Sequence, residues 1–252
     1  MTTTRTANTT PGGTPDHPLP VRPPPYGTDA ARRGPVTWSR ARRITAAVTV
    51  AAAPVVLLAG IAYHPFIADL RHKEAVAVAL TADMRRWSIA HLVVAVGSAL
   101  VALAFVAVAG ALRQRGEWRW SARSVPFVVV GGTLFALLPA MEITVLAATL
   151  SGADPVAVLL ELDAWFRPLL LAGAAAFAVG AAFVARSVVS AAALGRGATM
   201  LVVTALLVAA ASRFLPFTAA LLAGAGALVV ALWPLVGLVA ARPVPRARTA
   251  SR

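Results

Sequence analysis

Two residues whose side chains commonly exchange protons, His91 and Glu142, lie within strongly apolar stretches of the chain. A charged carboxylate at the centre of a membrane-crossing helix costs about 2.5–3.5 kcal/mol even on the insertion scale that gives the smallest penalty. Glu142 therefore needs a proton, a polar partner or access to water. We expect it either to belong to a functional polar site or to be a neutral carboxyl group that is hydrogen-bonded to a neighbouring helix.

His91 belongs to a stripe of small and polar residues. Ser88, His91, Ala95 and Ser98 recur at spacings of three and four, which places them on one face of a helix. This face should contact protein or a cavity rather than lipid. The candidate residues for binding a substrate or an ion are therefore Glu142, His91, Ser88 and Ser98, in a site facing the outer side of the membrane.

A second candidate site is a metal centre made of His64, Asp69, His72 and His91, because nitrogen and carboxylate ligands suit zinc or another divalent ion. The spacing of these residues matches no recognised metal motif. The alternative is that they are interfacial side chains bonded to nearby connections. We predict no cofactor and no catalytic residue, since the chain lacks cysteine, a phosphate-binding loop and a nucleophile elbow.

The composition indicates which elements must position these residues. Of the 252 residues, 59% are hydrophobic and 13% are charged, whereas a soluble domain has about 25% charged residues. The mean hydropathy is +0.77. This excess of apolar surface excludes a soluble enzyme and a fully disordered chain. We expect an all-α membrane protein, a bundle of six transmembrane helices, because the alternating pattern of a membrane barrel is absent.

Six stretches reach or approach the roughly 20 apolar residues that a helix needs to cross a membrane. The fifth is the weakest, because Arg213 lies near its end and only a short link separates it from the sixth. The connections 74–86 and 155–166 are expected to form short helices on the outer surface, either as simple interfacial packing or as a lid. The predicted spans are 44–63, 88–112, 125–150, 168–186, 197–215 and 217–241.

Both ends of the chain differ from this apolar region. Residues 1–43 are rich in Pro, Thr and Arg and predict a disordered tail, and residues 242–252 form a short basic tail. The net charge is +13, and the arginines concentrate in the tails and on alternate connections. The positive-inside rule then places both termini on the cytoplasmic side of a bacterial cytoplasmic membrane. This placement explains the charge without a nucleic-acid partner.

Small residues at four-residue spacing predict faces on which helices approach one another closely. The lipid bilayer is the expected partner of the remaining surface. The same small-residue faces could instead bind a second copy of the chain or another membrane protein. The glycines on these faces are Gly132, Gly180, Gly224 and Gly226.

Two short motifs stand out at the ends of predicted spans: His64-Pro65 after the first, and Trp87-Ser88-Ile89-Ala90-His91 at the start of the second. With these motifs, residues 44–241 loosely resemble a broad set of uncharacterised six-helix membrane proteins of high-GC Gram-positive bacteria. The resemblance implies a fold and a membrane location, and it implies no activity.

Three functions fit this sequence. The first is a non-enzymatic membrane protein that acts as a helper or partner subunit. The second is a small proton-coupled or cation-coupled transporter that uses Glu142 and His91. The third is a metal-binding membrane protein. Convergence of Glu142 and His91 beneath an open pocket would favour the second or third function.

Overall fold

The computed structural model describes residues 38–242, so most of both predicted tails lies outside the described residues. Within this range all regular secondary structure is helical, as the composition predicted. The seven helices are α2 (Arg40–Tyr63), α3 (Lys73–Ala82), α4 (Met84–Arg113), α5 (Arg119–Leu150), α6 (Pro155–Ala191), α7 (Arg196–Ser212) and α8 (Thr218–Ala240).

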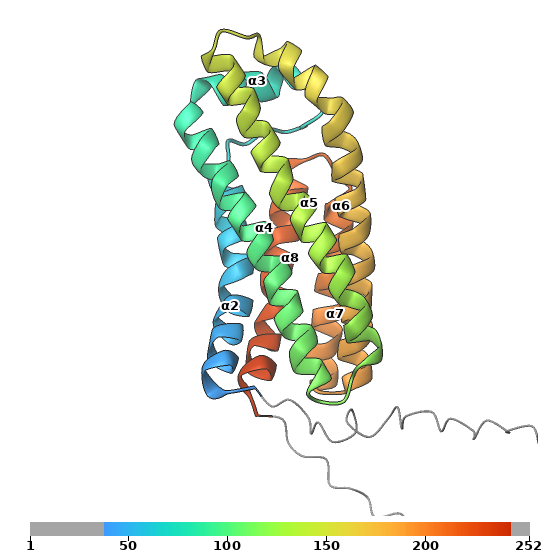
Figure 1. The fold of residues 1–252 in the computed structure, drawn as a ribbon. Coiled ribbons are helices and arrows are strands. Elements are labelled where there is room, and N and C mark those ends of the chain that lie inside the picture. The colour runs from blue at the N-terminus through green and yellow to red at the C-terminus, as the bar shows by residue number, and fades with distance from the viewer. Residues whose placement is uncertain (1–37, 243–252) are drawn as a thin grey trace, which may run out of the picture. The chain divides into compact units, whose positions relative to one another are not determined.

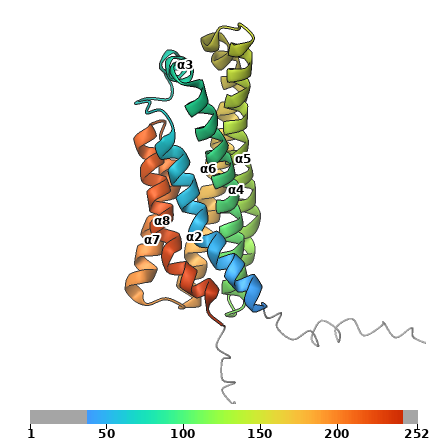
Figure 2. The same ribbon diagram turned by 90° about the vertical axis from the view of Figure 1, so that its left-hand side faces the viewer.

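Six of these helices form a closed ring. From α4 to α8 each helix packs against the next along the chain, and α2 completes the ring by packing against both α4 and α8 (Figures 1 and 2). α4, α5 and α6 extend beyond α2, α7 and α8 at one end, where α3 lies (Figure 2). We call this the α3 end. The described chain starts and finishes at the opposite end (Figure 1).

Five of the helices, α2, α4, α5, α6 and α8, are long and apolar enough to cross a membrane. α7 is also apolar but has only 17 residues. It ends at Ser212, three residues before the predicted boundary. The backbone N–H groups of Arg213, Phe214 and Leu215 bond to carbonyls three residues back, which makes a tight turn instead of another helical turn.

Two predicted surface helices differ from those observed. The stretch 74–86 is interrupted at Asp83, whose φ of −151° is not helical. The Asp83 carboxylate accepts a hydrogen bond from the backbone N–H of Arg86 (2.9 Å) and so caps the start of α4. The stretch 155–166 is not a separate helix. It is the first part of α6, which continues through Pro168 at the cost of one backbone hydrogen bond.

The first helix begins at Arg40, inside the range assigned to the N-terminal tail. Ser39 explains this start, because its hydroxyl oxygen accepts a hydrogen bond from the backbone N–H of Arg42 (3.2 Å). The predicted disorder of residues 1–37 lies outside the described residues.

Glycines allow neighbouring helices to approach closely. A methyl group added at Gly97 would lie 2.7 Å from the Cα atom of Leu57, so α4 and α2 touch backbone to backbone at this point. The predicted faces contain Gly132, Gly180 and Gly224, and a methyl group added at any of the three would lie within 3.0 Å of an atom of a neighbouring helix. A methyl group added at Gly226 would have no neighbour within 4 Å.

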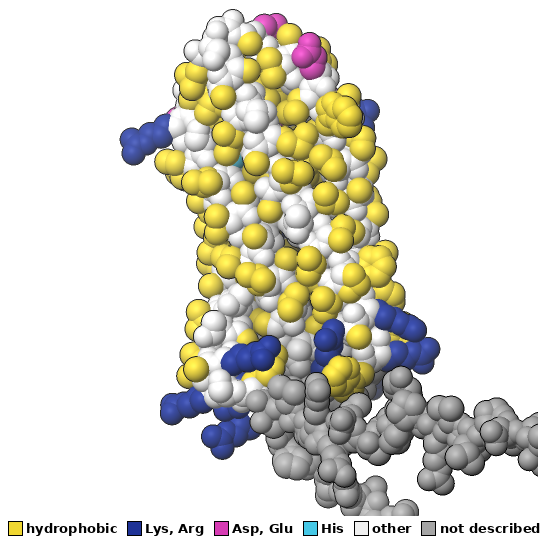
Figure 3. All heavy atoms as spheres, viewed as in Figure 1, with side chains coloured by type: hydrophobic (Ala, Val, Ile, Leu, Met, Phe, Trp, Pro, Cys, Tyr) yellow, Lys and Arg dark blue, Asp and Glu magenta, His cyan; other side chains and the backbone are white. Residues whose placement is uncertain are grey.

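The face of the ring seen in Figure 3 is apolar along its length and charged at its ends. Large apolar side chains such as Leu92, Val130 and Leu207 are exposed on the outward faces of the helices. Most basic side chains in residues 38–242 lie at the end opposite α3, where Glu117 is the one acidic residue. The basic residues at that end are Arg40, Arg42, Arg43, Arg113, Arg115, Arg119, Arg123, Arg186, Arg196 and Arg242.

Candidate functional site

A cavity of about 500 Å³ lies inside the ring, in the half nearer the α3 end. This size falls within the roughly 300–1,000 Å³ of typical small-molecule sites. Every helix of the ring, or a connection next to it, contributes to the wall, and α3 covers part of it. Most lining side chains are apolar, so the few polar ones determine what chemistry the cavity offers.

His91 and Glu142 meet in this wall. The ring Nε2 of His91 on α4 and the carboxyl Oε2 of Glu142 on α5 share a hydrogen bond. The His91 side chain is 4% exposed and that of Glu142 is 25% exposed. Two residues that are 51 positions apart in the chain therefore form one polar pair between adjacent helices.

A second hydrogen bond defines the protonation of this pair. The His91 ring Nδ1 lies 2.8 Å from the backbone carbonyl of Trp87, which can only accept, so Nδ1 carries a proton. One further proton is then shared between Nε2 of His91 and the carboxyl group of Glu142. The pair is either imidazole with carboxylic acid or imidazolium with carboxylate, and it is neutral overall in both forms.

Aromatic rings surround the His91 ring. Trp87 stacks on it with ring centroids 4.4 Å apart, and the His64 ring lies 4.9 Å away. His64 donates a hydrogen bond from Nδ1 to the carbonyl of Pro65 (2.7 Å). Burial lowers the pKa of His64, and the nearby His91 acts in the same direction. His64 is therefore a neutral neighbour of the pair.

The two predicted serines have different positions. Ser98 lines the cavity and is buried. Ser88 is not in the wall, and its hydroxyl donates a hydrogen bond to the carbonyl of Met84 (2.8 Å) within its own helix. The helical stripe thus contributes His91 and Ser98 to the site.

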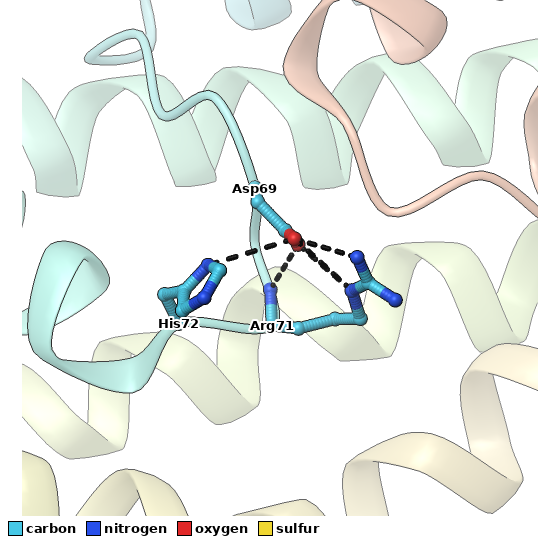
Figure 4. A network of polar contacts seen from close by, with 3 residues as sticks. All are labelled: Asp69, Arg71 and His72. Carbon is cyan, nitrogen blue, oxygen red and sulfur yellow. Dashed lines mark hydrogen bonds and ion pairs between the residues drawn. The ribbon is translucent and has the colours of Figure 1, made fainter.

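Asp69 and His72 belong to a separate polar network in the connection before α3 (Figure 4). The Asp69 carboxylate accepts hydrogen bonds from the Arg71 side chain at Nη2 (2.7 Å) and Nε (3.0 Å) and from its backbone N–H (2.9 Å). These bonds lower the pKa of Asp69 to about 2. The mostly exposed His72 lies with Nδ1 3.5 Å from the same carboxylate.

The four predicted metal ligands are therefore not gathered at one point. His64 and His91 adjoin each other, whereas Asp69 and His72 are held beside Arg71. Within residues 38–242 no three histidine, aspartate or glutamate side chains are arranged to hold a metal ion.

An ion-pair cluster that was not predicted from the sequence lies in the wall at the α3 end. The Lys73 ammonium at the start of α3 lies 2.7 Å from Asp163 of α6, and the Arg167 guanidinium lies 2.6 Å from the other oxygen of Asp163. The four-residue spacing of Asp163 and Arg167 is visible in the sequence. The third partner is 90 positions away, and no local pattern predicts it.

Arg213, in the turn after α7, is the other charged residue that sequence reasoning did not assign to the site. It lines the cavity, and its guanidinium carbon lies 4.6 Å from the ring centroid of Phe135 and 5.6 Å from that of Phe177. Its Nε is buried without a hydrogen-bond partner. In the sequence, the one sign of this role was the position of Arg213 at the end of an apolar stretch.

Comparisons of the chain with protein-family models, with characterised proteins and with solved structures gave no match. The site is therefore interpreted from its own geometry. It combines a largely apolar cavity, a neutral His91–Glu142 pair that shares a proton, an ion-pair cluster at the α3 end, and Arg213.

Proposed function

We propose that this protein is an integral membrane protein with six membrane-crossing helices that binds a small solute in the internal cavity and couples this binding to proton exchange at the His91–Glu142 pair. The activity would be proton-coupled transport. The observation that carries the proposal is the hydrogen bond between His91 and Glu142 in the wall of a cavity of about 500 Å³.

The apolar surface supports membrane insertion with α7 as the sixth crossing. Five helices meet the length for crossing a membrane, and α7, with 17 residues, is at the lower end of the roughly 17–25 residues required. The turn after α7 then lies at membrane depth. Non-helical backbone is tolerated there only where it is enclosed in protein or lines a cavity, and this turn lines the cavity.

The distribution of arginine supports an orientation. The end opposite α3 carries most of the basic residues and both ends of the described chain (Figures 1 and 3), which by the positive-inside rule favours a cytoplasmic location for that end. The α3 end and the cavity would face the outer side. Exposed Trp118 and Trp165 lie near opposite ends of the ring, where amphipathic rings meet the membrane interface.

The chemistry of the pair explains how binding and protonation are linked. In its neutral form the pair leaves no net charge among apolar helices, which avoids a large desolvation cost. Gain of a proton makes the pair cationic and loss of a proton makes it anionic. A solute that binds one of these forms better must change the proton affinity of the pair by the same factor.

The alternative function is that of a partner subunit without transport activity, in which the His91–Glu142 pair only stabilises the packing of α4 against α5. This alternative predicts a sealed cavity. The absence of cysteine from the chain permits a direct test. We expect Ser98→Cys, in the cavity wall, to react with a small water-soluble methanethiosulfonate reagent. Ser124→Cys, which is also buried but lies outside the wall, is the control and should not react.

An unreactive Ser98→Cys in a correctly folded protein would contradict solute access and favour the partner subunit. The protonation of the pair is tested separately by infrared difference spectroscopy. We expect a carboxylic-acid C=O band whose intensity changes with pH and which is missing from Glu142→Gln. If no such band depends on Glu142, the pair does not exchange protons and the coupling is wrong.

A further inference from the structure

We propose that Arg213 binds the carboxylate of a small amphipathic organic acid inside the cavity. This inference rests on the proposed function and names the class of solute for the same site. Arg213 carries a positive charge in the cavity wall that no carboxylate within residues 38–242 neutralises.

Each acidic group at or near the cavity is already bonded to another partner. Glu142 is bonded to His91, Asp163 to Lys73 and Arg167, and Asp69 to Arg71. The cavity is lined by four cations, Arg71, Lys73, Arg167 and Arg213. Within residues 38–242, Arg213 is the one of these four that has no carboxylate partner.

The position of Arg213 makes this imbalance significant. Arg213 is half-buried, so part of the hydration of its charge is lost, and its Nε is buried without a hydrogen-bond partner. Phe135 and Phe177 lie against the guanidinium and contribute cation–π contacts. These rings contact the guanidinium without accepting its N–H hydrogen bonds, so its donors remain available to an anion.

A carboxylate fits these donors better than a phosphate. The guanidinium presents parallel N–H groups that bind the two oxygens of a carboxylate, and the single charges cancel. A phosphate dianion would retain an excess negative charge among apolar side chains, at a high desolvation cost.

The rest of the cavity indicates an apolar body for this acid. Phe135, which contacts Arg213, lies seven residues before Glu142 on α5, a separation of roughly 10 Å along the helix. The apolar lining of the cavity also includes Leu138, Leu170 and Leu221. A hydrocarbon chain fits there, with its carboxylate at Arg213 and its other end toward the His91–Glu142 pair.

Octanoate is a suitable probe, and octanamide is its uncharged match. Protein carrying Ser98→Cys is placed in phosphatidylcholine nanodiscs, and the rate of thiol modification is measured against probe concentration. We expect octanoate to slow the modification and octanamide to have little effect. With Arg213→Gln, half-protection should need roughly ten-fold more octanoate, since a charge-assisted hydrogen bond is lost.

Two further variants test whether the effect of Arg213→Gln is specific to the guanidinium of Arg213. Arg213→Lys keeps the charge without the planar pair of donors and should give intermediate protection. Arg196→Gln removes an exposed arginine at the opposite end of the ring and should protect like the parent protein. The thermal unfolding midpoint of each variant shows whether it is folded.

Equal protection by octanoate and octanamide, equal protection with and without Arg213, or no protection by octanoate would overturn the assignment while leaving the cavity itself intact. Protection of the Ser98→Cys thiol by added phosphatidylglycerol but not by octanoate would also overturn the assignment, because the anion bound at Arg213 would then be a lipid phosphate. A Ser98→Cys thiol that never reacts would refute the open cavity, and with it both proposals.

Discussion

Trp87 holds the His91 ring in two ways. Its indole stacks on the imidazole at a centroid distance of 4.4 Å, and its backbone carbonyl accepts a hydrogen bond from Nδ1, with the nitrogen and oxygen 2.8 Å apart. Because the two residues are four positions apart on α4, one helical turn fixes both contacts. The ring can therefore present only Nε2 to Glu142, and it does so without rearrangement.

Removal of the carboxyl group of Glu142 should leave Nε2 of His91 buried without its partner. We expect Glu142→Ala to destabilise the protein by about 1–3 kcal/mol, the usual cost of such a group. Glu142→Gln still offers an amide N–H to Nε2 and should cost about 1 kcal/mol or less. Unfolding midpoints in nanodiscs measure both, with the exposed Glu161→Gln as control. Equal losses for the two Glu142 variants would contradict this interpretation.

Glu117 should make the stability of the protein depend on acid pH. Burial opposes its ionisation, but hydrogen bonds from the backbone N–H groups of Trp120 and Ser121, both 2.9 Å, outweigh burial and lower its pKa below the usual 4.5. The resulting stability is present above pH 4.5 and is lost as the pH falls toward the lower folded-state pKa.

Glu117→Gln should therefore cost about 0.5–2 kcal/mol at neutral pH, as for loss of a helix cap. The difference from the parent protein should shrink in acid. Unfolding midpoints at neutral and acidic pH measure this, and a difference that stays constant with pH would show that the carboxylate charge is not involved.

Gly97→Ala should weaken the contact between α4 and α2, since the added methyl group would lie 2.7 Å from the Cα of Leu57. Overpacking of this kind typically costs about 1–3 kcal/mol. Gly226→Ala is the matched control, because nothing lies within 4 Å of its added methyl group. It should be neutral or slightly stabilising. The two unfolding midpoints should differ in this order, and the reverse order would contradict the observed packing.

Lys73→Met should loosen α3 from α6, because the Lys73–Asp163 ion pair joins them. The loss of a partly buried pair worth about 1 kcal/mol would raise roughly five-fold the population of any conformation in which α3 has separated from α6. In the Ser98→Cys background the rate of thiol modification should rise by a similar factor. Lys73→Arg should preserve the slower rate. An unchanged rate in Lys73→Met would mean that α3 does not limit access to the cavity.

The proposed orientation predicts which connections can be labelled from outside the cell. Ala153→Cys, between α5 and α6, should react with a membrane-impermeant maleimide in intact cells. Ala193→Cys, between α6 and α7, should react only after the membrane is opened. Both positions are exposed, so their local accessibility is matched. The opposite result would invert the orientation.

Local patterns in the sequence account for most of the fold and part of the site. Apolar stretches predicted the helices, and the stripe of small and polar residues singled out His91 and Ser98. Two helices begin earlier than predicted, because Ser39 and Asp83 cap them by hydrogen bonds to the backbone. A hydropathy pattern does not predict such bonds. The Lys73–Asp163 pair depends on the packing of distant segments.

Arg213 shows a different limit of sequence reasoning. In the sequence it marks the weak end of an apolar stretch, which is typical of an arginine at a membrane interface. Its place in the cavity depends on the early end of α7 and on the positions of Phe135 and Phe177, which belong to two other helices. Only the assembled ring brings these three together.

The short α7 has a consequence for the surrounding lipid. Its 17 residues extend about 26 Å, less than the roughly 30 Å of a typical hydrocarbon core, while its neighbour α6 has 37 residues. In the six-crossing arrangement proposed above, either the turn after α7 lies within the hydrocarbon core or the bilayer beside α7 becomes thinner, and each ångström of such mismatch costs a fraction of a kcal/mol. In that arrangement, the lipids with the shortest acyl chains should collect beside α7.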